Sequence, residues 1–403
     1  MTLLLGIVGK PSSGKSTFLN ASCLTNAEVS ELPFTTIKPN RGVASVRSRC
    51  VCKEFNLIDN PRNSFCIDGI RLIPLNLLDV AGLVPDAHKG KGLGNQFLND
   101  LSRADLLIHI VDATGILDKA GQRLASGTHD PYEDILFLEQ EINLWFKKIL
   151  EREDWNKFTR SFSRVQRDFI NALTERISGL KITRYQVKLA LRESKLDNKN
   201  PSEWSDEDIY LYSKTLRELA KPIIIVANKI DKEVSVENLE ELKKKYNKII
   251  IPCSALAEYL LRKYEKEKII NYIPGSKDFK ILQPDKLNQK ELETLNKIKN
   301  KILNQFEGTG VQKVFKYAIF DVLNQICVYP VSDINKFTDN NENVLPDVFL
   351  VKKGTKLIDF VREKIHSELA DHFIHGIDAK TKKRLGENYE LAHNDIIKIV
   401  SAK

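Results

Sequence analysis

Short apolar runs recur in the first part of the chain and again after residue 220, each bounded by turn-forming residues. They lie at residues 3–8, 75–78, 106–111, 223–227 and 249–251. The runs are hydrophobic at nearly every position, which is typical of strands covered on both faces. The pattern therefore predicts an α/β fold, with a mostly parallel sheet and helices on both of its faces.

Two other stretches alternate between apolar and polar residues, which is typical of strands with one exposed face. They are residues 42–46 and 70–74. We expect these two stretches to pair as an antiparallel hairpin at the edge of the sheet.

Apolar residues at spacings of three and four dominate the region between the third and fourth apolar runs. The first such stripe consists of Ile135, Leu138, Ile142, Trp145 and Ile149, and similar stripes cover residues 165–177 and 209–219. This spacing places apolar side chains on one face of a helix. We expect a helical insertion over residues 131–220, either protruding as a coiled-coil hairpin or packed on the sheet.

The last part of the chain begins with helical patterns and ends with a mixture of strand and helix. Residues 258–305 are rich in lysine and glutamate, and a further helix is predicted over residues 311–326. A polar linker follows at residues 333–343. Beyond it, a strand, a helix and a last strand predict a small α+β domain, and they lie at residues 348–351, 357–365 and 396–400.

These patterns divide the 403 residues into more than one domain, as expected for a chain of this length. The predicted parts are the first half of the α/β domain at 1–130, the insertion at 131–220, the second half of the α/β domain at 221–335 and the C-terminal domain at 344–403.

Composition limits the class of protein further. No apolar run is long enough to span a bilayer, and the first strand runs directly into a glycine-rich turn without the features of a signal peptide. We therefore expect no membrane contact and a cytoplasmic location. The net charge of +8 permits an anionic partner such as RNA without requiring one.

Six cysteines occur in the chain, and in a cytoplasmic protein they are expected to be reduced. Cys50, Cys52 and Cys66 lie close in sequence and could form part of a zinc site. The sequence shows neither a fourth ligand nor the usual paired spacing. Free thiols are the favoured interpretation, and a metal site is the alternative.

The strongest chemical signal is a phosphate-binding loop after the first strand. Two glycines with four residues between them precede a lysine and a serine, as this motif requires. The glycines let successive backbone N–H groups converge on phosphate oxygens at the start of a helix. Lys15 is expected to neutralise the β- and γ-phosphates, and the Ser16 hydroxyl to bind Mg²⁺. The predicted loop residues are Gly9, Pro11, Ser12, Ser13, Gly14, Lys15, Ser16 and Thr17.

A second motif, which follows the apolar run at 223–227, predicts that the base is guanine. The Asp231 carboxylate can accept from the guanine N1–H and the 2-amino group, whereas adenine offers neither donor at these positions. Asn228 would brace the base and the phosphate loop, and the Lys229 stem would cover the base. Ser254 and Ala255 follow the next strand, where a backbone N–H would meet the guanine O6.

Two loops would respond to the γ-phosphate. Asp79 is the expected water-mediated partner of Mg²⁺, and the Gly82 N–H is the expected γ-phosphate contact. Thr36 would bind Mg²⁺ only while the γ-phosphate is present. Leu83 stands where many small GTPases have a glutamine that orients water, so intrinsic hydrolysis is expected to be slow, on the order of 10⁻⁴ to 10⁻² s⁻¹. His88 is a candidate for orienting the water, and a solvated histidine is the alternative.

Together these motifs resemble the Obg-like GTPase family, in particular its YchF-related branch. The matching stretches are Pro33-Phe34-Thr35-Thr36, Asp79-Val80-Ala81-Gly82-Leu83 and Gly90-Lys91-Gly92-Leu93-Gly94. The tail is similar to a TGS domain, a ubiquitin-like module. The resemblance implies a link to translation, with the ribosome or RNA bound through the TGS domain and the helical insertion. Well-known YchF-type relatives prefer ATP and have lost the Asn-Lys-x-Asp pattern, which this chain retains.

The sequence therefore supports a leading hypothesis and two alternatives. The leading hypothesis is a Mg²⁺-dependent GTPase, a slow switch that converts GTP to GDP and phosphate on or near ribosomes. One alternative is an ATPase of the same family. The other is a nucleotide-gated scaffold that binds RNA or the ribosome and hydrolyses nucleotide only incidentally.

Overall fold

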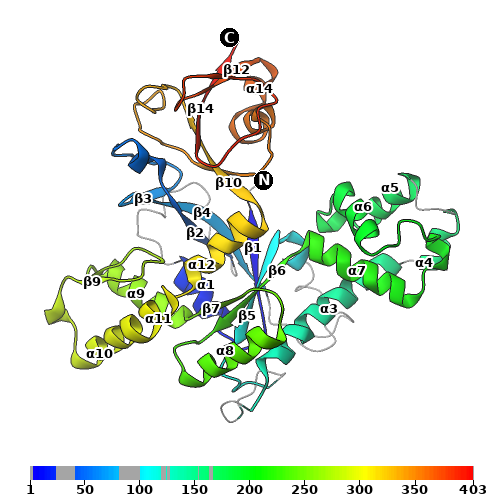
Figure 1. The fold of residues 1–403 in the computed structure, drawn as a ribbon, viewed down its shortest axis with the longest axis horizontal. Coiled ribbons are helices and arrows are strands. Elements are labelled where there is room, and N and C mark those ends of the chain that lie inside the picture. The colour runs from blue at the N-terminus through cyan, green and yellow to red at the C-terminus, as the bar shows by residue number, and fades with distance from the viewer. Residues whose placement is uncertain are drawn as a thin grey trace.

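The computed structural model describes residues 3–23, 41–80, 100–118, 124, 128–152, 154–162 and 167–402. Its central sheet has the strand order β2-β4-β1-β5-β6-β7, with β3 also paired to β4 (Figure 1). The strands are β1 (Leu4–Val8), β2 (Arg41–Arg49), β3 (Phe65–Ile67), β4 (Ile70–Asp79), β5 (Leu106–Asp112), β6 (Ile223–Asn228) and β7 (Ile250–Cys253).

The pairing within this sheet is mostly parallel, as the apolar runs predict. Strands β4, β1, β5, β6 and β7 run parallel to one another, and every residue of β5 is buried. Strand β2 is antiparallel to β4 at the edge. The predicted hairpin needs one correction, because residues 70–74 and 75–78 form one continuous strand. The alternating half of β4 lies next to β2 and β3, and its continuously apolar half also pairs with β1.

Helices cover both faces of the sheet, as the continuous hydrophobicity predicts. In β6, Ile224 and Val226 belong to the core under α1 (Lys15–Cys23) and α12 (Val311–Lys316). Ile225 and Ala227 instead join the core formed with α3 (Pro131–Glu151) and α8 (Glu233–Lys245). No helix within the described residues is long and apolar enough to cross a membrane.

The helical insertion forms a lobe beside the sheet (Figure 1). Its helices are α3, α4 (Trp155–Thr159), α5 (Arg167–Arg176), α6 (Arg184–Glu193) and α7 (Asp206–Ala220). The apolar stripes of several of these helices face a shared aromatic core. Trp155 and Trp204 stack with ring centroids 5.4 Å apart, and the Trp204 ring also lies 5.4 Å from Tyr212.

The chain between the sheet and the tail is helical with a small hairpin. It contains α9 (Ala255–Lys266), β8 (Ile270–Asn271), β9 (Lys280–Ile281), α10 (Gln289–Ile298) and α11 (Asn304–Phe306). The helix predicted over 311–326 ends earlier, because α12 continues only as a π-helical turn at Tyr317–Val322. Asn324 then takes a left-handed conformation with φ 49°, which ends helices, and a strand begins at Gln325.

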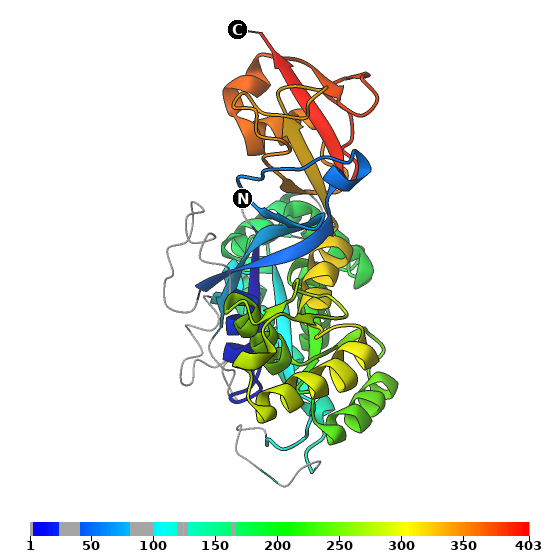
Figure 2. The same cartoon turned by 90° about the vertical axis from the view of Figure 1, so that its left-hand side faces the viewer.

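The C-terminal domain has its own sheet, with the strand order β11-β10-β14-β12-β13. These strands are β10 (Gln325–Val331), β11 (Phe349–Lys352), β12 (Phe373–Asp378), β13 (Arg384–Leu385) and β14 (Asp395–Ser401). Helices α13 (Leu357–Phe360) and α14 (Ser367–Asp371) complete the α+β fold. Strand β10 precedes the predicted domain start at 344, yet it lies between β11 and β14. Figure 2 shows this domain at one end of the molecule, next to the loop after β2.

Candidate nucleotide-binding site

The phosphate-binding loop connects β1 to α1. Its backbone has positive φ at Gly9 (144°), Ser12 (63°) and Gly14 (103°). A Cβ at Gly9 would lie 2.4 Å from the Ile110 carbonyl oxygen, and one at Gly14 would lie 2.3 Å from the Asn228 amide nitrogen. Both positions therefore require glycine, since a side chain would collide with fixed neighbours. The loop opens at the N-terminus of α1, where backbone N–H groups have no partner within the helix.

Lys15 and Asp79 are two of the charged groups at this loop. The Lys15 Nζ donates to the Lys10 carbonyl at 2.9 Å. Burial lowers the pKa of Lys15, and the nearby Asp79 carboxylate partly opposes that shift. Burial likewise raises the pKa of Asp79 against the effect of Lys15. The Asp79 Oδ1 is buried and accepts no hydrogen bond from the described residues.

An unpartnered carboxylate oxygen at the end of β4 fits a site for a hydrated cation. Mg²⁺ binds oxygen ligands and keeps several of its waters, which a nearby carboxylate can orient. Ser16 lies in the first turn of α1 with its side chain exposed. The residues present thus fit Mg²⁺, with Ser16 and Asp79 as the groups that would hold it.

Asn228 ends strand β6 and joins the phosphate loop to the loop after β7. Its Nδ2 donates to the Ser13 carbonyl at 3.0 Å, and its Oδ1 accepts from the Ala255 N–H at 3.1 Å. The side chain is 2% exposed, so both bonds are shielded from water. The Ala255 N–H belongs to the segment that we expected to supply a backbone donor to the guanine O6, and here it donates to Asn228 instead.

The carboxylate of Asp231 is fixed by a hydroxyl from the next loop. The Ser254 Oγ donates to the Asp231 Oδ1 at 2.8 Å and accepts from the Ala257 N–H at 3.3 Å. Asp231 keeps 21% of its side chain exposed. One oxygen is thus held by the protein while the carboxylate edge stays accessible to a base.

Asp112, which the motifs did not predict, positions Lys229. The Lys229 Nζ lies 2.8 Å from the Asp112 Oδ2 and donates to the Ser12 carbonyl at 3.0 Å. Asp112 is 1% exposed and also accepts from the Thr114 hydroxyl at 2.6 Å. The sequence could have indicated Asp112, because it is the first charged residue after the apolar run at 106–111.

A second missed contact ties the phosphate loop to the helical lobe. The Lys10 Nζ lies 2.6 Å from the Asp134 Oδ2 in the first turn of α3, with both side chains under 8% exposed. Lys10 also donates to the Leu117 carbonyl at 2.8 Å. His129 lies 2.9 Å from the other oxygen of Asp134. The loop that would bind phosphate is therefore held from the lobe side by a buried ion pair.

The structure brings together most of the site residues that the motifs predict. The loop from Gly9 to Thr17 lies against Asn228 and Lys229, and Asp231 contacts Ser254. The candidates Thr36, Gly82 and His88 lie outside the described residues, as does Leu83.

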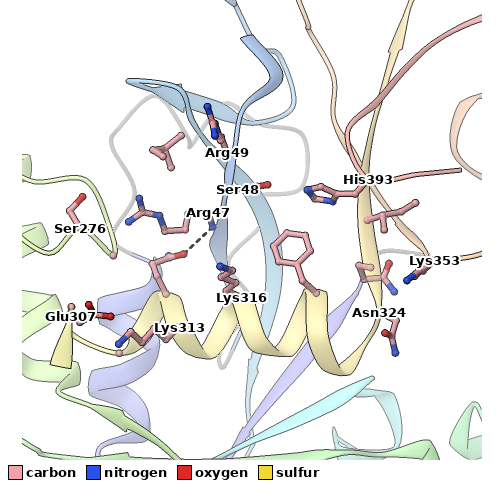
Figure 3. A pocket seen from close by; sticks show the side chains of 18 of the residues that line it. Arg47, Ser48, Arg49, Ser276, Glu307, Lys313, Lys316, Asn324, Lys353 and His393 are labelled. Atoms are coloured by element: carbon pink, nitrogen blue, oxygen red, sulfur yellow. Dashed lines mark hydrogen bonds between the residues drawn. The ribbon is translucent and has the colours of Figure 1, made fainter. Parts of the chain in front are cut away.

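A separate cleft of about 1160 Å³ lies between β2, α12 and the C-terminal domain. Figure 3 shows Arg47 and Arg49 on β2, Lys313 and Lys316 along the helix, and Lys353 on the C-terminal side. Lys277 also lines it, against only two carboxylates, Glu307 and Glu390. Among the described residues, no carboxylate lies within ion-pair distance of Arg49, Lys316 or Lys353. The cleft is therefore electropositive.

Comparisons with known proteins match three parts of the chain to family models. Residues 4–140 match a 50S ribosome-binding GTPase model. Residues 226–333 match the G4 motif-containing domain of the YGR210-like Obg-like GTPases, and residues 342–401 match the TGS domain.

Two similar proteins cover nearly the full length of the chain, and a third covers about two thirds of it. A GTP-binding protein of Methanocaldococcus jannaschii is 46% identical over 99% of both chains. The crystal structure of a GTP-binding protein from Pyrococcus horikoshii is 37% identical and covers 100% of both chains, with a TM-score of 0.76. A protein of Mycoplasma genitalium named ribosome-binding ATPase YchF is 32% identical over 64% of this chain and 67% of its own length.

The structure agrees with these matches in their order along the chain. The phosphate loop lies in the first matched region, the Asn228–Asp231 motif in the second, and most of the separate C-terminal sheet in the third. The chain belongs to the Obg-like P-loop GTPase family, in its YchF-related branch, with a C-terminal TGS domain.

Proposed function

We propose that this protein binds GTP with Mg²⁺, hydrolyses it slowly to GDP and phosphate, and thereby switches its affinity for ribosomes in the cytoplasm. The arrangement of Asn228, Asp231 and Ser254 carries the proposal for GTP, because it presents an oriented carboxylate at the place of the guanine edge. The names of the M. jannaschii and P. horikoshii relatives, both GTP-binding proteins, support this choice of base.

For hydrolysis, the chain supplies positioning and charge rather than a covalent nucleophile. The loop from Gly9 to Thr17 would bind the phosphates through its N–H groups, and Lys15 would move from the Lys10 carbonyl to the β- and γ-phosphates. Ser16, Asp79 and Thr36 would hold Mg²⁺. When bound, this ion neutralises charge on the phosphate oxygens. Since Leu83 cannot orient water, turnover on the order of 10⁻⁴ to 10⁻² s⁻¹ is expected without a partner.

The name of the M. genitalium relative supports a ribosome as the partner. Co-sedimentation of the protein with ribosomal particles, compared in a non-hydrolysable GTP analogue and in GDP, tests the switch. Binding that is at least about tenfold tighter with one nucleotide corresponds to a coupling free energy of about 1.4 kcal/mol. Equal binding in both nucleotides would rule out a switch and leave the scaffold alternative.

The ATPase alternative has the names of several relatives in its favour, since the same M. genitalium protein and the vertebrate Obg-like ATPase 1 proteins are named ATPases. Base selection by Asp231 argues against it, because adenine has no N1–H or 2-amino donor for an oriented carboxylate. A carboxylate facing the adenine N1 lone pair would also be repelled.

Within this proposal, the electropositive cleft beside the C-terminal domain is the surface that would contact ribosomal RNA. We expect the double substitution Lys316→Glu/Lys353→Glu to weaken RNA binding uniformly across sequences. Each lost phosphate contact should reduce the slope of log affinity against log salt by about 0.7 to 0.9. Binding of ribosomal RNA measured over a series of salt concentrations gives this slope.

The matched control exchanges two exposed lysines of α10 in the same way, as Lys290→Glu/Lys297→Glu. Both double variants change the net charge by the same amount, so a general electrostatic effect would appear in both. A weakening of equal size in the two variants would show that the cleft is not the RNA contact.

A further inference from the structure

Three cysteines and one aspartate meet at the tip of the extended edge of the central sheet. Cys50 follows β2, Cys52 lies in the 3₁₀ turn Val51–Glu54, and Cys66 lies on β3. Asp59, from the loop between them, supplies the fourth group that the sequence did not reveal. One ligand atom from each of these residues lies within 4.8 Å of every other.

Two distances between these atoms are close to those of a tetrahedral metal site. Zn–S bonds of about 2.3 Å in tetrahedral geometry place two sulfurs about 3.8 Å apart, and a sulfur and a carboxylate oxygen about 3.6 Å apart. The Cys52 and Cys66 sulfurs are 3.8 Å apart, and the Cys50 sulfur lies 3.2 Å from the Asp59 Oδ2. All the other distances are at most 4.8 Å, so shifts of up to about one ångström would complete the tetrahedron.

The surroundings also suit a bound cation rather than four independent side chains. Cys50 and Cys52 are at most 2% exposed, whereas Cys66 and Asp59 are only partly buried and leave a route for an ion. The Arg71 Nη1 donates to the Asp59 Oδ2 at 2.8 Å from a fully buried position. A buried donor on a ligating carboxylate is the usual support for a metal ligand.

We propose that Cys50, Cys52, Cys66 and Asp59 bind one Zn²⁺ ion as a structural site. Three thiolates select a soft or borderline metal, and four ligands without an open position are typical of structural zinc. Sulfurs this close together suit a single ion rather than a cluster. The site is separate from the nucleotide loop and independent of the function proposed above.

The position of the zinc site gives it a role in docking the C-terminal domain. The loop that carries Asp59 pairs with the chain that leads into β11. The Asn60 N–H donates to the Val344 carbonyl at 3.1 Å, and the Arg62 N–H to the Pro346 carbonyl at 2.7 Å. Arg71 also donates to the Leu345 carbonyl at 2.7 Å. Metal bound at the base of this loop would fix the surface on which the C-terminal domain rests.

The test is a metal titration of the full-length reduced protein, stripped with a chelator and kept free of nucleotide. We expect one Co²⁺ per chain, with the intense visible absorption of a tetrahedral cobalt–thiolate centre, and displacement by Zn²⁺. Cys66→Ser should weaken Co²⁺ binding at least about a hundredfold, since one of four ligands is lost. Cys23→Ser, which changes another partly buried thiol, should bind as the parent protein does.

Alkylation of the parent protein keeps the proposal testable should Cys66→Ser fail to fold. Zn²⁺ should protect Cys66, the partly buried thiol of the site, from a thiol reagent, and should leave the reaction rate of Cys23 unchanged. Failure to bind one Co²⁺, or unchanged Co²⁺ binding by folded Cys66→Ser, would overturn the zinc site. None of these results would count against the proposed binding of GTP.

Discussion

Replacement of Asp231 by asparagine is expected to lower GTP affinity by roughly 10² to 10⁴ and to create a preference for xanthosine triphosphate. The carboxylate would accept two hydrogen bonds from guanine, and an amide in its place would leave a donor facing the guanine donors. Xanthine carries a carbonyl where guanine has the 2-amino group, so it can accept from that amide. Because Ser254 fixes the orientation of this side chain, we expect the exchange to produce this full loss of GTP affinity.

Competition of GTP, xanthosine triphosphate and ATP against a fluorescent nucleotide measures this change directly. The control is Asp285→Asn, which alters an exposed aspartate outside the site by the same chemistry. Unchanged GTP affinity in Asp231→Asn would show that Asp231 does not contact the base.

The second large effect is on stability and concerns the buried ion pair between Lys10 and Asp134. Asp134→Ala should lower the free energy of unfolding by about 3–5 kcal/mol, because it leaves a charged lysine buried without its partner. Lys10→Met/Asp134→Leu removes both charges and should recover most of that loss. Denaturant unfolding followed by circular dichroism gives these differences.

An exposed ion pair provides the matched control for this experiment. Lys147 and Asp206 are also 2.6 Å apart, but the Asp206 side chain is 81% exposed. Asp206→Ala should therefore reduce stability by less than about 1 kcal/mol. If Asp134→Ala is no more destabilising than Asp206→Ala, Lys10 and Asp134 do not form a buried pair in solution.

Much of the fold followed from hydrophobic patterning because the central strands are buried on both faces. The continuous runs at 106–111 and 223–227 both became strands of the parallel sheet. Strand β10 was missed for a related reason. The helix predicted over 311–326 covers the first two residues of β10, and the place where that helix ends depends on the backbone conformation of one residue, Asn324.

The candidate site was predictable where its chemistry lies within short motifs. The residues from Gly9 to Ser16 form one continuous motif, and Asn228 and Asp231 belong to another, so the spacing within each motif can be read from the sequence. The supporting contacts were not predictable, because their partners are far apart in the chain. Lys229 and Asp112 are separated by 117 positions, and only the pairing of β5 with β6 brings them together. Asp59 was likewise recognisable as a fourth ligand only once the hairpin had folded around the cysteines.

Titration of the unmodified protein with GTP and with ATP, each in excess Mg²⁺, tests the central claim most directly. With an oriented Asp231 carboxylate that accepts from guanine, GTP should bind at least about 100-fold more tightly than ATP. Equal affinity for the two nucleotides would contradict selection of the base by this carboxylate and would favour the ATPase alternative.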